Sequence, residues 1–176
     1  MEIHWIVILV AILPFWFLQN CIHELSHGLT IRLGWRWGFK IWPLPSFGVG
    51  GRFSFAHTTF NRTEKSKDLE ESDWALIFAM PKLVNILFIS VFSILAAVTS
   101  NDVIAMLTLV FVWANFIDFG VGMLPAMRQS VGNVHNDMIK LQRILKLPGK
   151  LVQIASTGFV IAIAVPVVIT TLIQLF

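Results

Sequence analysis

Four long apolar stretches limit what this chain can fold into. They run from about His4 to Leu33, Trp74 to Val98, Val103 to Leu124 and Leu151 to Leu175. A helix needs about 20 mostly apolar residues to cross a bilayer, and each stretch is long enough. The composition agrees, since 56% of the residues are hydrophobic and only 13% are charged. We therefore expect a single domain over residues 1–176, an all-α membrane protein with about four transmembrane helices.

The segments between the stretches have a different texture. Residues 35–55 are rich in aromatic residues, Gly and Pro with partial alternation, which predicts short strands and turns. Residues 57–73 are polar and predict a surface loop. A second long loop, residues 125–150, is predicted to contain a short amphipathic helix at about 136–147.

The basic residues predict an orientation. Twelve of the thirteen Lys and Arg residues lie in the two long loops or, like Arg32, at the end of a span beside them, and the remaining one, Lys82, lies in the second predicted span. By the positive-inside rule, both loops face the cytoplasm of a multi-pass membrane protein, and the small size suggests a prokaryotic plasma membrane. We find no nucleic-acid-binding motif. The single cysteine excludes a disulfide framework within the chain.

The chemistry-bearing motif is HELSH, residues 23–27. His23 and His27 are four residues apart, so on a helix both imidazoles can reach one metal ion. Glu24 would lie beside that ion, where it could take a proton from water. This HExxH pattern is typical of zinc hydrolases. A polar seam between helices, including Gln19 and Asn20, is the alternative, but it requires no such order of His, Glu and His.

A catalytic zinc needs three protein ligands and one open position. The residue types that zinc prefers leave four candidates for the third ligand: Asp118, Asp137, His135 and His57. Spacing alone does not separate Asp118 from Asp137. Asp118 could instead be a polar group in helix packing, and Asp137 could be a helix N-cap.

Three motifs, in this order along the chain, resemble the site-2 protease family of intramembrane zinc metalloproteases. HELSH resembles the family's zinc motif in the first helix. Residues 79–85 (AMPKLVN) resemble its second-helix pattern, and residues 121–125 (VGMLP) followed by Asp137 resemble its Asn-x-x-Pro and Asp-Gly element. The glycine-rich residues 47–55 fall where the family has a small membrane-associated β-hairpin between the first and second helices.

The sequence departs from the family pattern at three positions. Met80 stands in place of a glycine, Gly122 in place of an asparagine, and Met138 in place of the glycine that follows the aspartate. These departures bear on the third ligand, for which Asp118 remains the alternative to Asp137.

The resemblance implies a function and a site. The function is a zinc-dependent endopeptidase that cuts a transmembrane protein or peptide within the lipid bilayer. The metal ligands would be His23, His27 and Asp137, with Glu24 as general base. Asn85 would help to position the substrate or the β-hairpin, although an interhelical hydrogen bond would also suit it.

Two questions about the active form stay open at this point. An edge strand in residues 47–55 could capture an unwound substrate by strand addition. Four helices enclose a site only thinly, so a homo-oligomer is compatible with the sequence. The alternative function is a catalytically silent zinc-binding membrane protein that holds a partner helix.

Overall fold

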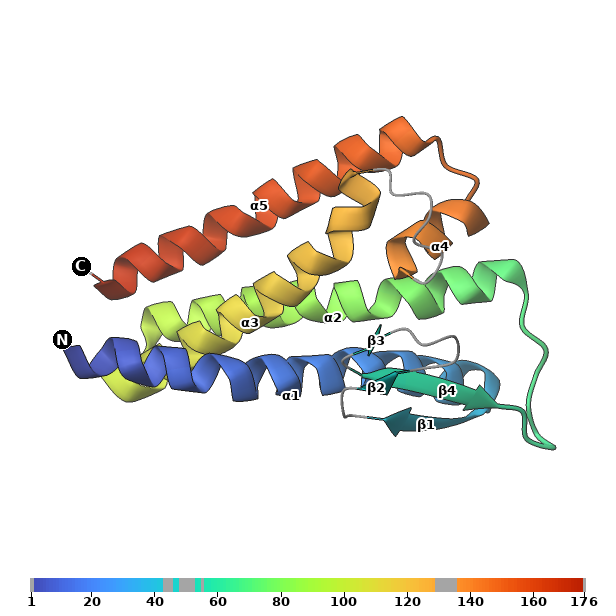
Figure 1. Cartoon of the computed structure of the whole chain (residues 1–176), viewed down its shortest axis with the longest axis horizontal. Coiled ribbons are helices and arrows are strands. Elements are labelled where there is room, and N and C mark those ends of the chain that lie inside the picture. Colours follow the sequence, from blue (N-terminus) through green and yellow to red (C-terminus); the bar gives the residue numbers. More distant parts are fainter. Residues whose placement is uncertain (1, 43–45, 48–52, 55, 129–135, 176) are drawn as a thin grey trace.

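Our computed structural model describes residues 2–42, 46–47, 53–54, 56–128 and 136–175. These residues form four long helices and one short helix, α4 (Asp137–Ile144). The long helices are α1 (Glu2–Trp35), α2 (Glu71–Val98), α3 (Asp102–Met127) and α5 (Gly149–Leu175) (Figure 1). The mostly helical fold and its four long helices are therefore confirmed. By length and composition, α2, α3 and α5 could each cross a membrane.

Local capping explains where the second and third helices begin. Glu70 and Asp73 form a reciprocal capping box, which starts α2 three residues before the predicted span. Asn101 caps α3 by accepting a hydrogen bond from the Ile104 backbone N–H at 3.0 Å. Because few residues separate α2 from α3, the two helices form the expected antiparallel hairpin.

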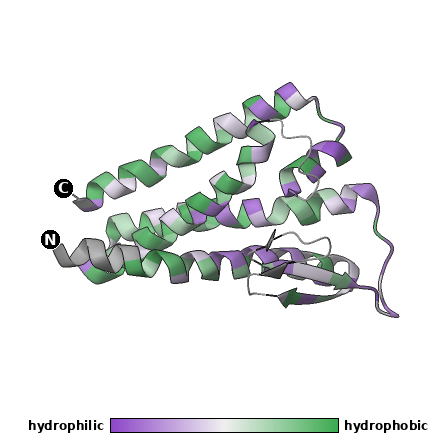
Figure 2. Ribbon diagram, in the orientation of Figure 1, coloured by the Kyte–Doolittle hydropathy of each residue, from purple (hydrophilic) through white to green (hydrophobic). Residues whose placement is uncertain are grey.

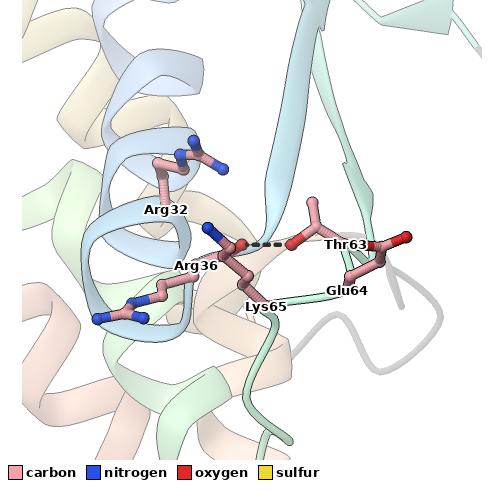
Figure 3. Close-up of a pocket in the computed structure, with 5 residues that line it drawn as sticks. All are labelled: Arg32, Arg36, Thr63, Glu64 and Lys65. Carbon is pink, nitrogen blue, oxygen red and sulfur yellow. Dashed lines mark hydrogen bonds between the residues drawn. The ribbon is translucent and has the colours of Figure 1, made fainter.

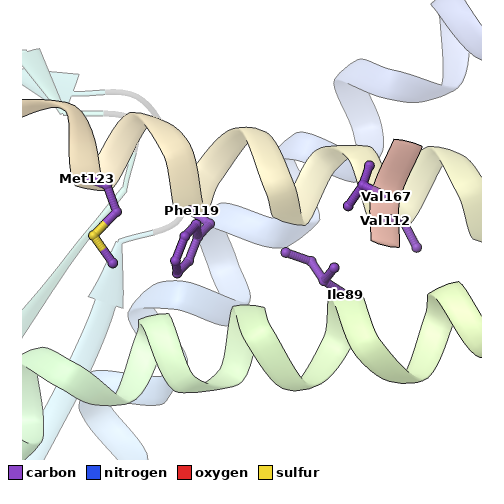
Figure 4. Close-up of a cluster of buried hydrophobic side chains, with 5 residues drawn as sticks. All are labelled: Ile89, Val112, Phe119, Met123 and Val167. Atoms are coloured by element: carbon purple, nitrogen blue, oxygen red, sulfur yellow. The ribbon is translucent and has the colours of Figure 1, made fainter. Parts of the chain in front are cut away.

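The helices pack around α3, which contacts α1, α2 and α5. Five buried apolar side chains from α2, α3 and α5 form a cluster (Figure 4): Ile89, Val112, Phe119, Met123 and Val167. Together with α2, α3 thus separates α1 from α5 and supplies the centre of the bundle.

The surface and the interior differ from those of a typical water-soluble protein. Leu83, Leu87, Val91 and Ile94 follow one face of α2, and each is at least 50% exposed. Polar side chains are instead buried between the helices, among them a fully buried Asn85. Figure 2 shows the long helices mostly green, with purple concentrated at the end that holds α4 and the start of α2.

Along the chain, two short antiparallel ladders fall between α1 and α2. Strand β1 (Gly38–Trp42) pairs with β4 (His57–Asn61), and both contact α1, while β2 (Ser46–Phe47) pairs with β3 (Phe53–Ser54). Strands were expected at 35–55, but the loop prediction was wrong for residues 57–61. Thr58, Thr59 and Phe60 favour a strand, and β4 is half buried. The rest of the predicted hairpin, residues 43–45, 48–52 and 55, lies outside the described residues.

Strands β1 and β4 are attached to α1 beside the HELSH motif. A side chain at Gly28 would place its Cβ 2.2 Å from the Phe39 ring, so only glycine allows this close approach of β1. The Thr58 hydroxyl donates a 2.8 Å hydrogen bond to the backbone carbonyl of Glu24. The sheet is therefore held next to the motif.

The C-terminal end of α1 is held by the segment that follows β4. Arg36 has a positive φ of 61° and its carbonyl accepts a 3.0 Å hydrogen bond from the Thr63 hydroxyl. Figure 3 shows this contact beside a pocket of about 670 Å³, which is lined by Arg32, Arg36, Thr63, Glu64 and Lys65. In Figure 1 the sheet and α4 lie at one end of the molecule, and the two termini lie at the other.

Candidate metal centre

The two histidines of HELSH meet a carboxylate from α4. His23 and His27 lie on one face of α1, with ring centroids 5.2 Å apart. Oδ2 of Asp137 lies 3.3 Å from Nε2 of His23 and 3.1 Å from Nε2 of His27. One ligand atom from each residue lies within 4.8 Å of the other two, so this group could hold a metal ion.

The other ring nitrogens show why a cation suits this group. Nδ1 of His27 donates to the backbone carbonyl of Ile77 at 2.8 Å, and Nδ1 of His23 donates to Oδ2 of Asp118 at 3.0 Å. Both partners are acceptors, so each Nδ1 must carry a proton. In the neutral imidazoles both Nε2 lone pairs then face a carboxylate oxygen. Three electron-rich atoms converge, and only protons or a metal ion can hold them together.

The two distances from the Asp137 carboxylate to the histidines fit tetrahedral coordination. Two ligands bound to zinc at about 2.0–2.1 Å in tetrahedral geometry lie about 3.3 Å apart. The two Nε2 to Oδ2 distances, 3.3 and 3.1 Å, are close to this value. Three such ligands leave one position open, as in catalytic zinc sites.

Helix α4 presents Asp137 without using it as a cap. The N-cap is Asn136, whose side-chain oxygen accepts from the backbone N–H groups of Met138 and Ile139 at 3.0 and 3.3 Å. The Asn136 amide also donates to the carbonyl of Gly122 at 3.0 Å, which ties α4 to α3. The N-cap role expected as an alternative for Asp137 therefore belongs to its neighbour, and the Asp137 carboxylate is left to face the histidines.

The electrostatics keep Asp137 ionised. Burial alone would raise the pKa of its carboxyl, but hydrogen bonds and positive charge from protonated His23 and His27 outweigh burial and hold this pKa well below its usual range. Oδ1 of Asp137 lies 3.4 Å from Nζ of Lys140, which also sits over the Phe78 ring. Oδ2 therefore faces the histidines while Oδ1 faces the lysine.

Asp118 lies on the other side of His23. Its Oδ2 accepts hydrogen bonds from Nδ1 of His23 and, at 2.6 Å, from the Asn85 amide. The oxygen of Asn85 in turn accepts from the Gln19 amide. This buried chain links α1, α2 and α3, and it places Asp118 where carboxylates commonly orient a metal-binding histidine. The structure thus separates the two aspartates by the histidine nitrogen that each one faces.

Sequence reasoning placed Lys82 in the second span but gave no role to this further buried charge of α2. Its Nζ lies 3.3 Å from the backbone carbonyl of Asp118 and 3.6 Å from Oδ2 of the same residue. A signal for it existed, because a lysine inside an apolar helix is costly and often functional.

The remaining candidates lie as follows. Glu24 is partly buried and its backbone carbonyl accepts from Thr58, but the role of its carboxylate stays a prediction. His57 lies in β4 and does not belong to the group formed by His23, His27 and Asp137 among the described residues. His135 lies outside the described part of the chain.

Comparison with known proteins adds no assignment. No protein-family model matches the chain, and neither does any curated protein or solved structure.

Proposed function

We propose that this protein is a zinc-dependent endopeptidase that hydrolyses a peptide bond within or near a transmembrane segment of another protein. One observation carries the proposal: Nε2 of His23, Nε2 of His27 and Oδ2 of Asp137 converge while both Nδ1 atoms are committed as donors. These three residues would hold the zinc ion. The three motifs that resemble site-2 proteases agree with this reading.

The chain's own residues supply the acid–base steps. When bound, zinc would supply a Lewis acid that makes water nucleophilic near neutral pH. Glu24 would accept the proton from the attacking water and pass it to the leaving amine. His23 stays oriented by Asp118, and His27 by the carbonyl of Ile77, so both present Nε2 to the same point.

The bilayer as a setting is supported by the distribution of side chains. The outward face of α2 is apolar, and α2, α3 and α5 are long and apolar enough to cross a membrane. The two basic loops belong to the same end of the helix bundle, opposite both termini (Figure 1). We therefore place this end, with the sheet and α4, on the cytoplasmic side.

A helical substrate must unwind before its backbone can be cut, because its carbonyls are bonded within the helix. The sheet is well placed to receive the unwound segment, since β4 is bonded through Thr58 to the backbone of Glu24. Strand addition would replace the lost helical hydrogen bonds with bonds to a sheet edge. We propose that Asn85 contributes indirectly to substrate positioning, through its hydrogen bond to Asp118.

The test combines turnover with metal analysis. The purified protein, in liposomes, is offered a peptide with one transmembrane segment, and both cleavage and bound zinc are measured. We expect cleavage by the wild type, its loss on chelation, and its loss in Glu24→Gln with zinc still bound. Glu64→Gln, an exposed substitution, is the matched control and should cleave normally.

Two results would overturn the proposal. One is cleavage that persists in Glu24→Gln or after complete removal of zinc. The other is a wild type that binds zinc but turns over none of a panel of transmembrane peptides, which would favour a silent zinc-binding protein.

A further inference from the structure

The charge of Lys82 is buried inside the helix bundle. Its side chain is only 6% exposed, although it lies in one of the helices long and apolar enough to span a membrane. Removing an ammonium group from water is unfavourable unless the group is paired and hydrogen-bonded. A leucine or methionine would fill the same space without this cost, so the charge itself requires an explanation.

The partner of this ammonium is Asp118. Nζ lies 3.3 Å from its backbone carbonyl and 3.6 Å from its Oδ2. The same oxygen accepts from His23 at 3.0 Å and from Asn85 at 2.6 Å. Three groups from two helices, α1 and α2, therefore surround one carboxylate oxygen of α3.

Gly122 makes room for the ammonium. It lies one helical turn after Asp118, and a Cβ added there would be 2.2 Å from Nζ and 2.6 Å from Cε of Lys82. Any side chain at this position would force the end of Lys82 to shift from the place where it now meets Asp118. Gly120, two residues earlier in the same helix, has open space at the corresponding position.

We propose that Lys82 is a positioning residue for the metal centre, and that Gly122 provides the space in which it acts. Lys82 holds the Asp118 carboxylate against Nδ1 of His23, and this contact aims Nε2 of His23 at the metal. Groups that orient a metal-binding histidine change metal affinity or activity by about 10–100-fold. Because Lys82 acts through Asp118, its effect falls at the lower end of that range. The inference rests on the metal site of the proposed function.

The main test measures cobalt(II) binding and its visible absorption spectrum in detergent-solubilised protein. Lys82→Met keeps the bulk of the side chain but removes the charge. We expect about 10-fold weaker cobalt binding and an altered spectrum. In an Asp118→Asn background, Lys82→Met should add little, because the residue through which it acts has already changed. Equal effects in both backgrounds would show a general structural role and overturn the proposal.

The second test uses the two glycines. Gly122→Ala should weaken cobalt binding as Lys82→Met does. Gly120→Ala is the same substitution in the same helix, but its added methyl group meets no neighbour, so this variant should bind cobalt like the wild type. In a Lys82→Ala background, Gly122→Ala should have no further effect on binding. If Gly122→Ala binds cobalt as tightly as Gly120→Ala, the ammonium is not acting where we place it.

The two proposals fail in different ways. A wild type that binds no cobalt or zinc contradicts the metal site itself. A wild type that binds cobalt, with Lys82→Met matching it in affinity and spectrum, contradicts only the role of Lys82.

Discussion

The two aspartates of the site face His23 from opposite sides and are supported in different ways. Asp118 belongs to a long helix, and one of its oxygens receives Asn85 and Lys82 as well as the histidine. Asp137 belongs to an eight-residue helix, and its two oxygens are divided between the histidines and Lys140. In the proposed metal site, the inner carboxylate, Asp118, would orient a ligand, whereas the outer one, Asp137, would complete the ligand set.

Burial does not explain this difference. The side chains of Asp118 and Asp137 are 13% and 15% exposed. The lysines that pair with them do differ in exposure: the side chain of Lys82 is 6% exposed and that of Lys140 is 32% exposed. The role that we propose for each carboxylate therefore rests on the histidine nitrogen that it faces and on how completely its partners are enclosed.

We expect the largest loss of zinc affinity from Asp137→Asn. Removing the charge of a direct ligand should weaken zinc binding by more than the roughly 100-fold that an orienting group can contribute. Competition titration with a zinc chelator measures this change. His57→Ala, a histidine outside the group, is the control and should bind zinc normally.

Asp118→Asn, at the carboxylate that faces Nδ1 of His23, should weaken zinc binding by about 10–100-fold without abolishing it. The asparagine can still accept a hydrogen bond from His23, but it lacks the charge. The same titration applies. If Asp118→Asn abolished binding while Asp137→Asn only weakened it, the two assignments would have to be exchanged.

Asn85→Ala tests the hydrogen-bonded chain behind Asp118. It leaves the buried Gln19 amide without this partner and removes one donor to Asp118, which should cost about 1–3 kcal/mol of unfolding free energy. Denaturant unfolding in detergent, with zinc chelated, measures the loss. Asn20→Ala is the control, because the hydrogen bond of the Asn20 amide to the carbonyl of Trp16 lies within its own helix. Unchanged stability with a raised KM would instead make Asn85 a direct substrate contact.

The smallest effect should come from Lys140→Met. A partly exposed ion pair contributes up to about 1 kcal/mol, which corresponds to about 5-fold in zinc affinity. Lys82→Met should therefore cost more than Lys140→Met when the two are titrated side by side. If Lys140→Met lost more zinc affinity than Lys82→Met, the buried lysine would be the less important of the two.

Much of the helical framework was predictable. The ends of the long helices lie within a few residues of the predicted spans, since a helix lets a long apolar stretch satisfy its backbone polar groups within itself. Helix α4 was expected at 136–147 and occupies Asp137–Ile144. Strand β4 was missed because a polar segment suggests a loop until its partner strand is known.

The network behind the histidines was less predictable. The sequence shows Asn85 and Lys82 as polar residues in an apolar helix, but it does not show which atoms they contact. Asn136 and Asp137 are adjacent, and either could have capped α4. The Asn136 amide also reaches Gly122 of α3, and this contact between helices is absent from any local pattern.

The sequence by itself determined the pair of histidines, because a spacing of four residues on a helix places both imidazoles on one face whatever surrounds them. It could not choose the third member of the group, since Asp118 and Asp137 lie 95 and 114 residues beyond His23. Only the packing of α3 and α4 against α1 decided that one carboxylate faces Nδ1 and the other faces both Nε2 atoms. Hydrogen-bond geometry at such separations depends on where helices cross, and that is a property of the tertiary structure.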